Sequence, residues 1–517
     1  MDCGLAVGKE LEKNRRSGQA LHGIEQEKLL SMSMAVQGSG LAAAKFWIVV
    51  MADALSVQPI PYQDPVAAFA PFAGDPVAAF LDSAAEIGGR GRYSYIAADP
   101  FRVITAGGGA KIDSIATAGD PFELLSREMR RYRLPAETGL PPFQTGAVGI
   151  LGYELGRHLE RLPKPAPNDL DFPDMVIGLY DTIASFDAKE RRAWVIASDF
   201  AGGGPPSRRR PAAARAAAMA ERILSAPPLN DVEWTARGAW RAEIARSAYE
   251  RSVAKVIDYI FAGDIFQANL SQRFLGEIPA GLHPFMLYRR LRALSPAPFA
   301  AYLACGEGGA VVSASPERFL RLGTNGGVET RPIKGTRPRG QTPEEDRKLA
   351  AGLRASEKDR AENLMIVDLL RNDLSRVCIL GSVRVTDLFK LESFANVHHL
   401  VSEVRGRLAP GCGAVDLLAA TFPGGSVTGA PKIRAMEIIT ELEPARRGPY
   451  CGSIAWLGFN GTMESNIVIR TVTVKNGTAV AQAGGGIVAD SDPAAEYDEA
   501  ITKIGALLAC LDGKGAY

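Results

Sequence analysis

Two Asn-Gly dipeptides near the C-terminus, Asn460-Gly461 and Asn476-Gly477, constrain the fold more than any other feature of this sequence. Each lies between runs rich in β-branched and aromatic residues, a setting in which Asn-Gly favours the type I′ turn of a β-hairpin. Because a hairpin turn joins antiparallel strands, we expect 450–459, 466–474 and 478–483 to form one antiparallel meander.

The rest of the chain divides by composition. Residues 1–55 are polar and then rich in glycine and alanine, and we expect them to form an extension outside the fold. Short strand-like runs follow in 56–225, which includes the Gly-, Pro- and Arg-rich linker 202–210. From 240 to 512, helical periodicity alternates with strands, which predicts the main domain.

The overall composition is that of an ordinary globular protein. The 517 residues are 46% hydrophobic and carry a formal net charge of +1, so charge gives no reason to expect a nucleic-acid or membrane partner. The six cysteines include no CxxC pair, which indicates free thiols in a reducing compartment. Lys45 interrupts the apolar stretch 40–51, which is too short to span a bilayer, and we expect a cytoplasmic protein.

Helix starts can be read at three places after residue 340. Thr342 begins a capping box with proline at the first helical position, and Ser356 opens a second helix that we expect to run to Leu370. Asp492 caps the last helix, with Pro493 in its first turn. A fourth helix is predicted at 246–261 from its apolar spacing.

The segment 330–340 holds four cations, two prolines and two glycines but no carboxylate, which predicts a shaped loop. Lys334 lies in it, three residues from Arg331 and three from Arg337. Neighbouring cations lower the pKa of a lysine, and a neutral amine is a nucleophile. The alternative is a solvated basic loop.

The last predicted helix places Glu496, Glu499 and Lys503 on one face. Two carboxylates one turn apart repel each other unless a cation lies between them, so this face is a candidate Mg²⁺ site. Glu362, on the helix after Ser356, could supply a third carboxylate. The alternative is a solvated face with Glu499 and Lys503 as a surface ion pair.

Two glycine-containing segments could bind an anion. Gly484, Gly485 and Gly486 follow a strand and would bring backbone N–H groups close to a ligand. The segment 422–432 does not match the Walker pattern, so we reject nucleotide binding, but its helix start could cradle a carboxylate.

Three further polar groups have two interpretations each. Arg470 lies in an apolar strand-like run and needs either an anionic ligand or a structural salt bridge. Glu317 is either a general acid or a partner of Arg318. The pair His398-His399 is either switchable or structural.

Seven segments together resemble the chorismate-utilising enzymes, among them the first components of anthranilate synthase and aminodeoxychorismate synthase and the isochorismate and salicylate synthases. They are FQANLSQRF (266–274), SASPERFL (313–320), PIKGTRPRG (332–340), AENLMIVDLLRNDLSRV (361–377), FPGGSVTGAPK (422–432), YCGSIAW (450–456) and AGGGIVADSDPAAEYDEAITK (483–503). The resemblance is strong over 240–510 and looser over 60–200. It implies an α+β fold in which two large antiparallel β-sheets pack as a sandwich with helices outside.

Two positions discriminate within this family. Isochorismate and salicylate synthases carry a lysine base where this chain has Gln267, so water addition is disfavoured. Anthranilate synthases have alanine in PIAGT, whereas Lys334 stands in PIKGT as in the aminodeoxychorismate synthases. The resemblance therefore favours formation of 4-amino-4-deoxychorismate for p-aminobenzoate and folate synthesis. The alternatives are an anthranilate synthase component I and an inactive regulatory or scaffold subunit.

The resemblance also implies a site. Lys334 would attack C2 of chorismate, Glu317 would protonate the departing C4 hydroxyl, and His399 would lie near the ring. Glu362 and Glu499, with Glu496 close by, would hold Mg²⁺. The groups expected to bind the substrate are Gln267, Ser426, Thr428, Lys432, Tyr450, Arg470, Gly484, Gly485, Gly486 and Lys503.

Two further expectations concern partners and ligands. We find no glutaminase pattern in the sequence, so ammonia is expected from solution or from a separate glutaminase subunit in a heterodimer. Ser83, Tyr93, Ser94, Pro298 and Phe299 resemble the family's tryptophan pocket, which is inhibitory in anthranilate synthases and can be structural in aminodeoxychorismate synthases. The sequence leaves open whether tryptophan binds.

Overall fold

The computed structural model describes residues 55–86, 89–200, 210–231, 233–234, 240–393 and 397–512. Apart from Leu55, the predicted extension 1–55 lies outside these ranges, and so does the predicted linker 202–210 apart from Arg210. Both therefore stay predictions.

The described strands form two 12-stranded antiparallel sheets. In order, the first contains β1 (Leu55–Ile60), β10 (Arg192–Ser198), β9 (Thr182–Asp187), β3 (Tyr93–Ala98), β2 (Val77–Asp82), β13 (Phe299–Cys305), β14 (Gly309–Ser315), β23 (Thr471–Lys475), β24 (Thr478–Ile487), β12 (Gln267–Glu277) and β11 (Arg241–Ala242), with β20 (Gly429–Ala430) also on β12. The second contains β17 (Ile333–Pro338), β19 (Val397–Arg407), β16 (Gly327–Thr330), β15 (Arg318–Leu322), β22 (Met463–Asn466), β21 (Ser453–Gly458), β7 (Gly146–Leu151), β8 (Met175–Tyr180), β4 (Arg102–Ala106), β5 (Ala110–Ile112) and β6 (Ile115–Ala116), with β18 (Arg384–Ser393) also on β19.

The sheets pack face to face, as the alternation of their buried side chains shows. On β13, Leu303 joins Trp456 of β21 in one apolar cluster shared by both sheets, whereas Tyr302 belongs to a cluster on the opposite face. A strand points successive side chains to opposite faces, so each sheet has one face toward the other sheet and one toward the helices. This arrangement confirms the predicted sandwich.

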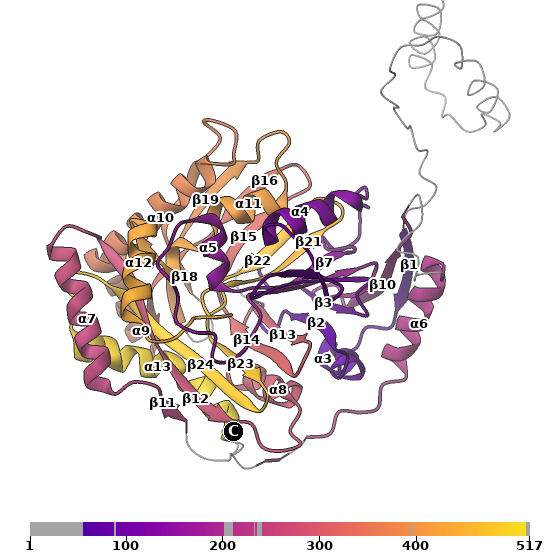
Figure 1. Cartoon of the computed structure of the whole chain (residues 1–517), viewed down its shortest axis with the longest axis horizontal. Coiled ribbons are helices and arrows are strands. Elements are labelled where there is room, and N and C mark those ends of the chain that lie inside the picture. Colours follow the sequence, from indigo (N-terminus) through magenta and orange to yellow (C-terminus); the bar gives the residue numbers. More distant parts are fainter. Residues whose placement is uncertain are drawn as a thin grey trace, which may run out of the picture. The chain divides into compact units, whose positions relative to one another are not determined.

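Helices cover the outer faces (Figure 1). The α-helices are α3 (Pro65–Phe69), α4 (Pro121–Arg131), α5 (Gly156–Leu159), α6 (Ala212–Leu224), α7 (Arg246–Phe261), α8 (Pro284–Leu294), α9 (Pro343–Ala355), α10 (Glu357–Ser375), α11 (Ala414–Thr421), α12 (Lys432–Leu442) and α13 (Pro493–Leu511). Short 3₁₀ turns η1 (Ala70–Phe72), η2 (Tyr153–Leu155) and η3 (Gly425–Val427) complete the helices of the described residues.

The predicted helix starts agree with the observed ones. The Thr342 side chain accepts a hydrogen bond from the N–H of Glu345 at 3.2 Å, and the Asp492 side chain accepts one from Ala495 at 2.8 Å. The fourth predicted helix, 246–261, matches α7. Helix α10 continues past the predicted end at Leu370, because apolar spacing persists through the buried Leu374.

The predicted single meander is wrong, although both hairpins exist. The hairpin at Asn460-Gly461 joins β21 to β22 in the second sheet, and that at Asn476-Gly477 joins β23 to β24 in the first. Between them, 467–470 crosses from one sheet to the other. Asn476 and Gly477 both have positive φ, as a type I′ turn requires, whereas Asn460 does not.

Both sheets draw strands from 56–225 and from 240–512. For example, β2 pairs with β13, and β7 pairs with β21. The two segments predicted from composition therefore share one layered core, and neither could bury its sheet faces without the other.

Candidate active site

The residues expected to act on a substrate gather at one end of the sandwich, where the first sheet ends in β24 and β12 and the second ends in β17. Helices α10 and α13 bring the acidic residues to the same end. Figure 1 shows this end, with α7, α9 and α12 around it, opposite the end that carries β1 and α6.

Lys334 lies in strand β17, not in the predicted loop. Its strand pairs with β19, where Leu400 is opposite Lys334, and the register shifts at Gly335, which has φ of 77°. A Cβ at Gly335 would lie 2.8 Å from Cδ1 of Leu353 on α9, so the glycine also permits close packing. The prolines and glycines therefore shape a bulged strand.

The pKa of Lys334 is lowered, as predicted, but for a different reason. Burial is the largest cause and Lys503 adds repulsion, whereas Glu362, Glu317 and Glu499 oppose the shift. Arg331 and Arg337 are held in ion pairs with carboxylates instead. Neither arginine is among the largest causes of the shift.

Glu317 is buried against the same amine. It is 8% exposed, and burial raises the pKa of its carboxyl, while a hydrogen bond from Ser426 and the charge of Lys334 lower it. Arg318 pairs with Glu329 and Glu464, so the alternative in which Glu317 is the partner of Arg318 is wrong. A protonated Glu317 beside a neutral Lys334 could serve as an acid beside a nucleophile.

The three carboxylates predicted to bind metal are electrostatically coupled. Burial raises the pKa of Glu362 and of Glu496, and the two carboxyls repel each other. The Glu499 side chain is 57% exposed and forms a 2.6 Å ion pair with Lys503. Partial desolvation raises the pKa of Glu499, but the charge and hydrogen bond of Lys503 lower it overall. Within the described ranges no three His, Cys, Asp or Glu side chains converge as a ready metal cage. Mg²⁺ needs only one or two protein carboxylates with water or substrate oxygens, so the donor set fits that ion.

The predicted glycine segment forms the floor beside these carboxylates. A Cβ at Gly485 would lie 2.8 Å from Oε2 of Glu496, and one at Gly486 would lie 1.7 Å from Nε2 of Gln267. Lys503 Nζ donates to the Gly484 carbonyl at 3.0 Å. Side chains from α13 and β12 therefore occupy the space above Gly485 and Gly486, and at Gly484 a Cβ would lie 1.9 Å from the Leu270 carbonyl oxygen.

Gln267 is 1% exposed, and its Oε1 has no hydrogen-bond partner within the part of the chain that the structure describes. An unpaired buried acceptor is costly unless something supplies a donor. Gln267 therefore faces the site with an unused acceptor, as a substrate-binding group would.

Arg470 and His399 lie close to other candidate active-site residues. Arg470 is not inside a strand as predicted, but has φ of 54° in the crossing segment and donates from Nη1 to the Lys503 carbonyl at 2.8 Å. His399 on β19 lies opposite Thr336 on β17, and its Nδ1 forms a 2.9 Å hydrogen bond with the Thr336 hydroxyl. Burial and the charge of Arg90 lower the pKa of His399 to about 4, so the ring is neutral near pH 7.

Three predicted substrate-binding residues have structural partners of their own. Lys432 forms a 2.6 Å ion pair with Asp373 and donates to the Thr421 carbonyl. Thr428 donates to the Gly424 carbonyl at 3.2 Å, which holds the η3 turn that presents Ser426. Burial raises the pKa of the Tyr450 phenol, whose hydroxyl hydrogen bonds to Cys451.

Sequence reasoning missed Lys358. Its charge lowers the pKa of Glu362, Glu496 and Glu499, so this exposed lysine of α10 lies near all three carboxylates. The signal in the sequence was its position four residues before Glu362, which places both on one helix face.

Away from these residues, a cavity that is open to solvent lies between the sheets. Ser83, Tyr93, Pro298 and Phe299 line it, as expected of a shared pocket. Ser94 supports its wall, accepting a 3.0 Å hydrogen bond from the N–H of Ser83. This geometry brings the five predicted pocket residues together.

Comparison with known proteins decides the family. A model of chorismate binding enzymes matches residues 80–509. The chain belongs to the chorismate-binding enzyme family. Aminodeoxychorismate synthase component 1 of Klebsiella aerogenes is 42% identical over 446 residues, 85% of this chain and 95% of that protein. Anthranilate synthase component 1 of Streptomyces coelicolor is 41% identical over 452 residues, 86% of each chain.

A solved structure agrees with the fold. Anthranilate synthase component I from Streptococcus pneumoniae TIGR4 superposes with a TM-score of 0.70 at 34% identity, covering 81% of this chain and 92% of that one. This chorismate-binding enzyme is therefore a chorismate-utilising protein of the aminodeoxychorismate or anthranilate synthase kind. None of its described helices combines the length and apolar character needed to cross a lipid bilayer.

Proposed function

We propose that this chorismate-binding enzyme converts chorismate and ammonia to 4-amino-4-deoxychorismate. The observation that carries the proposal is Lys334, a partly buried amine with a lowered pKa beside the buried carboxyl of Glu317. The similarity to aminodeoxychorismate synthases supports it. Anthranilate synthase activity is the second candidate, favoured by relatives of nearly equal identity.

The proposed chemistry is two displacements that run through the ring diene. The neutral amine of Lys334 forms a bond to C2, both ring double bonds shift by one position, and the C4–O bond breaks as Glu317 gives its proton to the leaving hydroxyl. The adduct nitrogen then loses a proton. Ammonia next bonds to C4, both double bonds shift back and the C2–N bond breaks, with a proton from the ammonia nitrogen passed to the lysine nitrogen. The net change is chorismate plus ammonia to aminodeoxychorismate plus water.

Substrate binding would use the charges around these two groups. Lys503 and Arg470 would attract the substrate carboxylates, while Gln267 would accept a hydrogen bond through its unpaired Oε1. Glu362, Glu496 and Glu499 would hold Mg²⁺, whose charge, when bound, would offset that of a ring carboxylate. A neutral His399 would line the ring without adding a competing charge.

Ammonia would come from a partner. The relatives are named as first components, which indicates a second component that releases ammonia from glutamine. We therefore propose a heterodimer with a glutaminase subunit, and expect ammonium salts to replace that subunit in vitro.

Product analysis tests the proposal. Purified protein is incubated with chorismate, Mg²⁺ and ammonium, and the products are separated and weighed by mass spectrometry. The proposed function expects aminodeoxychorismate without pyruvate. Anthranilate with an equal amount of pyruvate would establish the second candidate instead, and no turnover would indicate an inactive subunit.

A further inference from the structure

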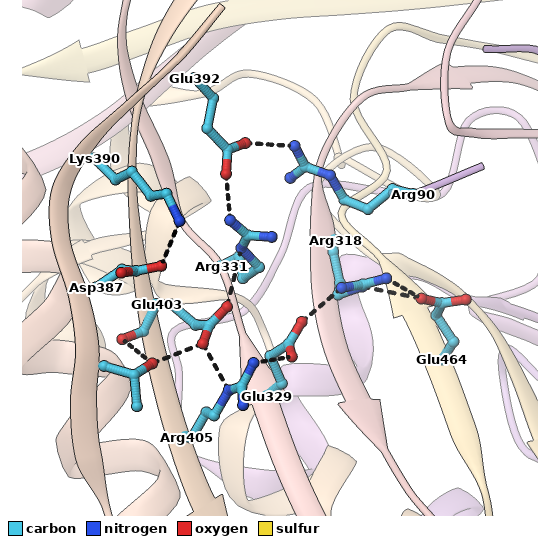
Figure 2. Close-up of polar contacts among 11 residues, drawn as sticks. Arg90, Arg318, Glu329, Arg331, Asp387, Lys390, Glu392, Glu403, Arg405 and Glu464 are labelled. Carbon is cyan, nitrogen blue, oxygen red and sulfur yellow. Dashed lines mark hydrogen bonds and ion pairs between the residues drawn. The ribbon is translucent and has the colours of Figure 1, made fainter. Parts of the chain in front are cut away.

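Arg331, three residues before Lys334, lies within a chain of ion pairs that continues on both sides of it (Figure 2). Arg331 Nη2 bonds to Oε1 of Glu392, and its Nε lies 3.4 Å from Oε2 of Glu403. The other oxygen of Glu392, Oε2, accepts a 2.7 Å bond from Nη2 of Arg90. We call these four residues the Arg331 network.

The network is shielded from water. Its side chains are 3% exposed for Arg90, 11% for Arg331, 13% for Glu392 and 7% for Glu403. Buried ion pairs with good geometry resist displacement, because removing one partner leaves an uncompensated buried charge. Its two hydrogen-bonded pairs, Arg331 with Glu392 and Glu392 with Arg90, are therefore buried connections rather than surface pairs.

Its place in the sheet gives it a specific effect. Arg331 and Pro332 separate β16 from β17, and both strands pair with the same strand, β19. Lys334 is on β17 at the edge of the second sheet, so it has a β-ladder on one side only. The bulge at Gly335 further weakens that ladder. The rest of its support comes from packing against α9 and α10 and from ion pairs on either side of the amine.

Two anchors flank the amine. Beyond it, Arg337 pairs with Asp359 at the start of α10 at 2.9 Å, and that arginine is 40% exposed. Before it, the better-buried Arg331 joins β17 to β18 through Glu392, and Glu392 in turn joins Arg90 from the N-terminal half. The second anchor is the stronger by burial and by number of partners.

We propose that Arg331 and Glu392 are positioning residues for Lys334: their ion pairs fix the approach of strand β17 and thereby hold the amine in place against Glu317. The inference rests on the proposed function for the role of Lys334. Arg90 also lines the solvent-open cavity, so the network reaches the wall of that cavity.

The test uses the full chain with Arg331→Met, Arg331→Lys and Glu392→Gln. Arg102→Met is the matched control, because Arg102 pairs with the buried Glu128 at 2.5 Å in β4 and α4, outside the candidate site. We expect Arg331→Met to lower kcat about 10²-fold with KM changed less than about threefold, since a displaced reacting group loses rate rather than binding. Arg331→Lys can keep one of the two ion pairs, so its kcat should lie between that of Arg331→Met and that of the natural protein.

A second readout does not depend on the product. Lys334 is labelled with trinitrobenzenesulfonate across pH and quantified by peptide mass spectrometry. The groups that act electrostatically on Lys334 are Glu317, Glu362, Glu499 and Lys503, and all stay in place in these variants. A loosened strand hydrates the amine, so the labelling midpoint should move to higher pH in Arg331→Met and Glu392→Gln but not in Arg102→Met.

The outcomes separate the two proposals. An unchanged kcat and labelling midpoint in both Arg331→Met and Glu392→Gln would overturn the positioning role, whatever the product. The positioning role would also be overturned if the variants lost as much stability as Arg102→Met while the labelling midpoint of Lys334 did not move. If Arg331→Met does not fold, the isosteric Glu392→Gln decides. Anthranilate as the product of the natural protein would overturn the proposed function alone.

Discussion

The active site and the solvent-open cavity lie between the same two sheets, yet their charged side chains differ in how fully they are paired. In the active site, burial raises the pKa of Glu317 and Glu362 and lowers that of Lys334, so none of the three has a partner that fully compensates its charge. At the cavity, Asp82 is paired with Arg292 at 2.5 Å and with the hydroxyl of Tyr288 at 2.7 Å.

The difference separates side chains that take part in the reaction from side chains that stabilise the fold. Perturbed pKa values in a buried cluster are typical of catalytic groups, because each must exchange a proton or bind a charge during the reaction. Satisfied ion pairs, such as Arg318 with Glu464, stabilise the wall and keep its shape. Substitutions at the first place should therefore change rate, and those at the second should change stability.

The largest effect should come from Lys334→Ala. Loss of the nucleophile should lower aminodeoxychorismate formation by about 10³-fold or more, because no neighbouring group replaces the amine. Product is measured by mass spectrometry, with Lys255→Ala, a change to an exposed ion pair, as the control. A rate within twofold of the natural protein would remove the covalent step.

Glu317→Gln should lower kcat by about 10² to 10³-fold, since it removes the general acid. The pH profile carries a second test. Lys334 must be neutral, so the rate should rise with pH through its lowered pKa. Glu317 must be protonated, so the rate should fall with pH through its raised pKa. Glu317→Gln should lose the falling limb alone, and a profile that keeps both limbs would assign the acid elsewhere.

Metal dependence should be smaller but distinct. A chelator should stop turnover and Mg²⁺ should restore it. Glu496→Gln should raise the Mg²⁺ concentration for half activity by about 10-fold, because one anionic ligand is lost. Asp498→Asn, on the exposed side of the same helix, should not shift it. An identical Mg²⁺ titration for both variants would exclude Glu496 as a ligand.

The smallest effect on rate should come from the cavity. Asp82→Asn breaks the pairs with Arg292 and Tyr288 and should lower the free energy of unfolding by about 2 kcal/mol, less than for a fully buried pair because Arg292 is 30% exposed. Turnover should stay within twofold. Urea unfolding is the measurement, with Asp75→Asn, a more exposed pair, as the control. A large loss of rate with unchanged stability would contradict the comparison.

Local features were predictable where the chain's own chemistry decides them. The caps of Thr342 and Asp492 and the turn at Asn476-Gly477 depend on residues within a few positions, and all three formed as predicted. The segment 330–340 was not predictable in the same way. Its prolines and glycines favoured a loop, but pairing with β19 made a bulged strand of it.

The candidate site shows the same limit. Motifs brought Lys334, Glu317 and Glu362 into one hypothesis, but only the fold shows why the amine loses its proton. The sequence pointed to Arg331 and Arg337, whereas burial between α10 and the sheets, with Lys503 from the far end of the chain, lowers the pKa of Lys334. The sequence did not indicate Lys358, because its carboxylate neighbours come from two helices that only the fold brings together.

The sequence by itself determined the family, the helix ends and the second hairpin turn, because motifs and caps depend on residue identity and short spacing. Only the tertiary structure decided that the two hairpins belong to different sheets, and which charges are paired. Those outcomes depend on which strands meet across hundreds of residues and on how much water remains around each charge, and neither is written in any local pattern.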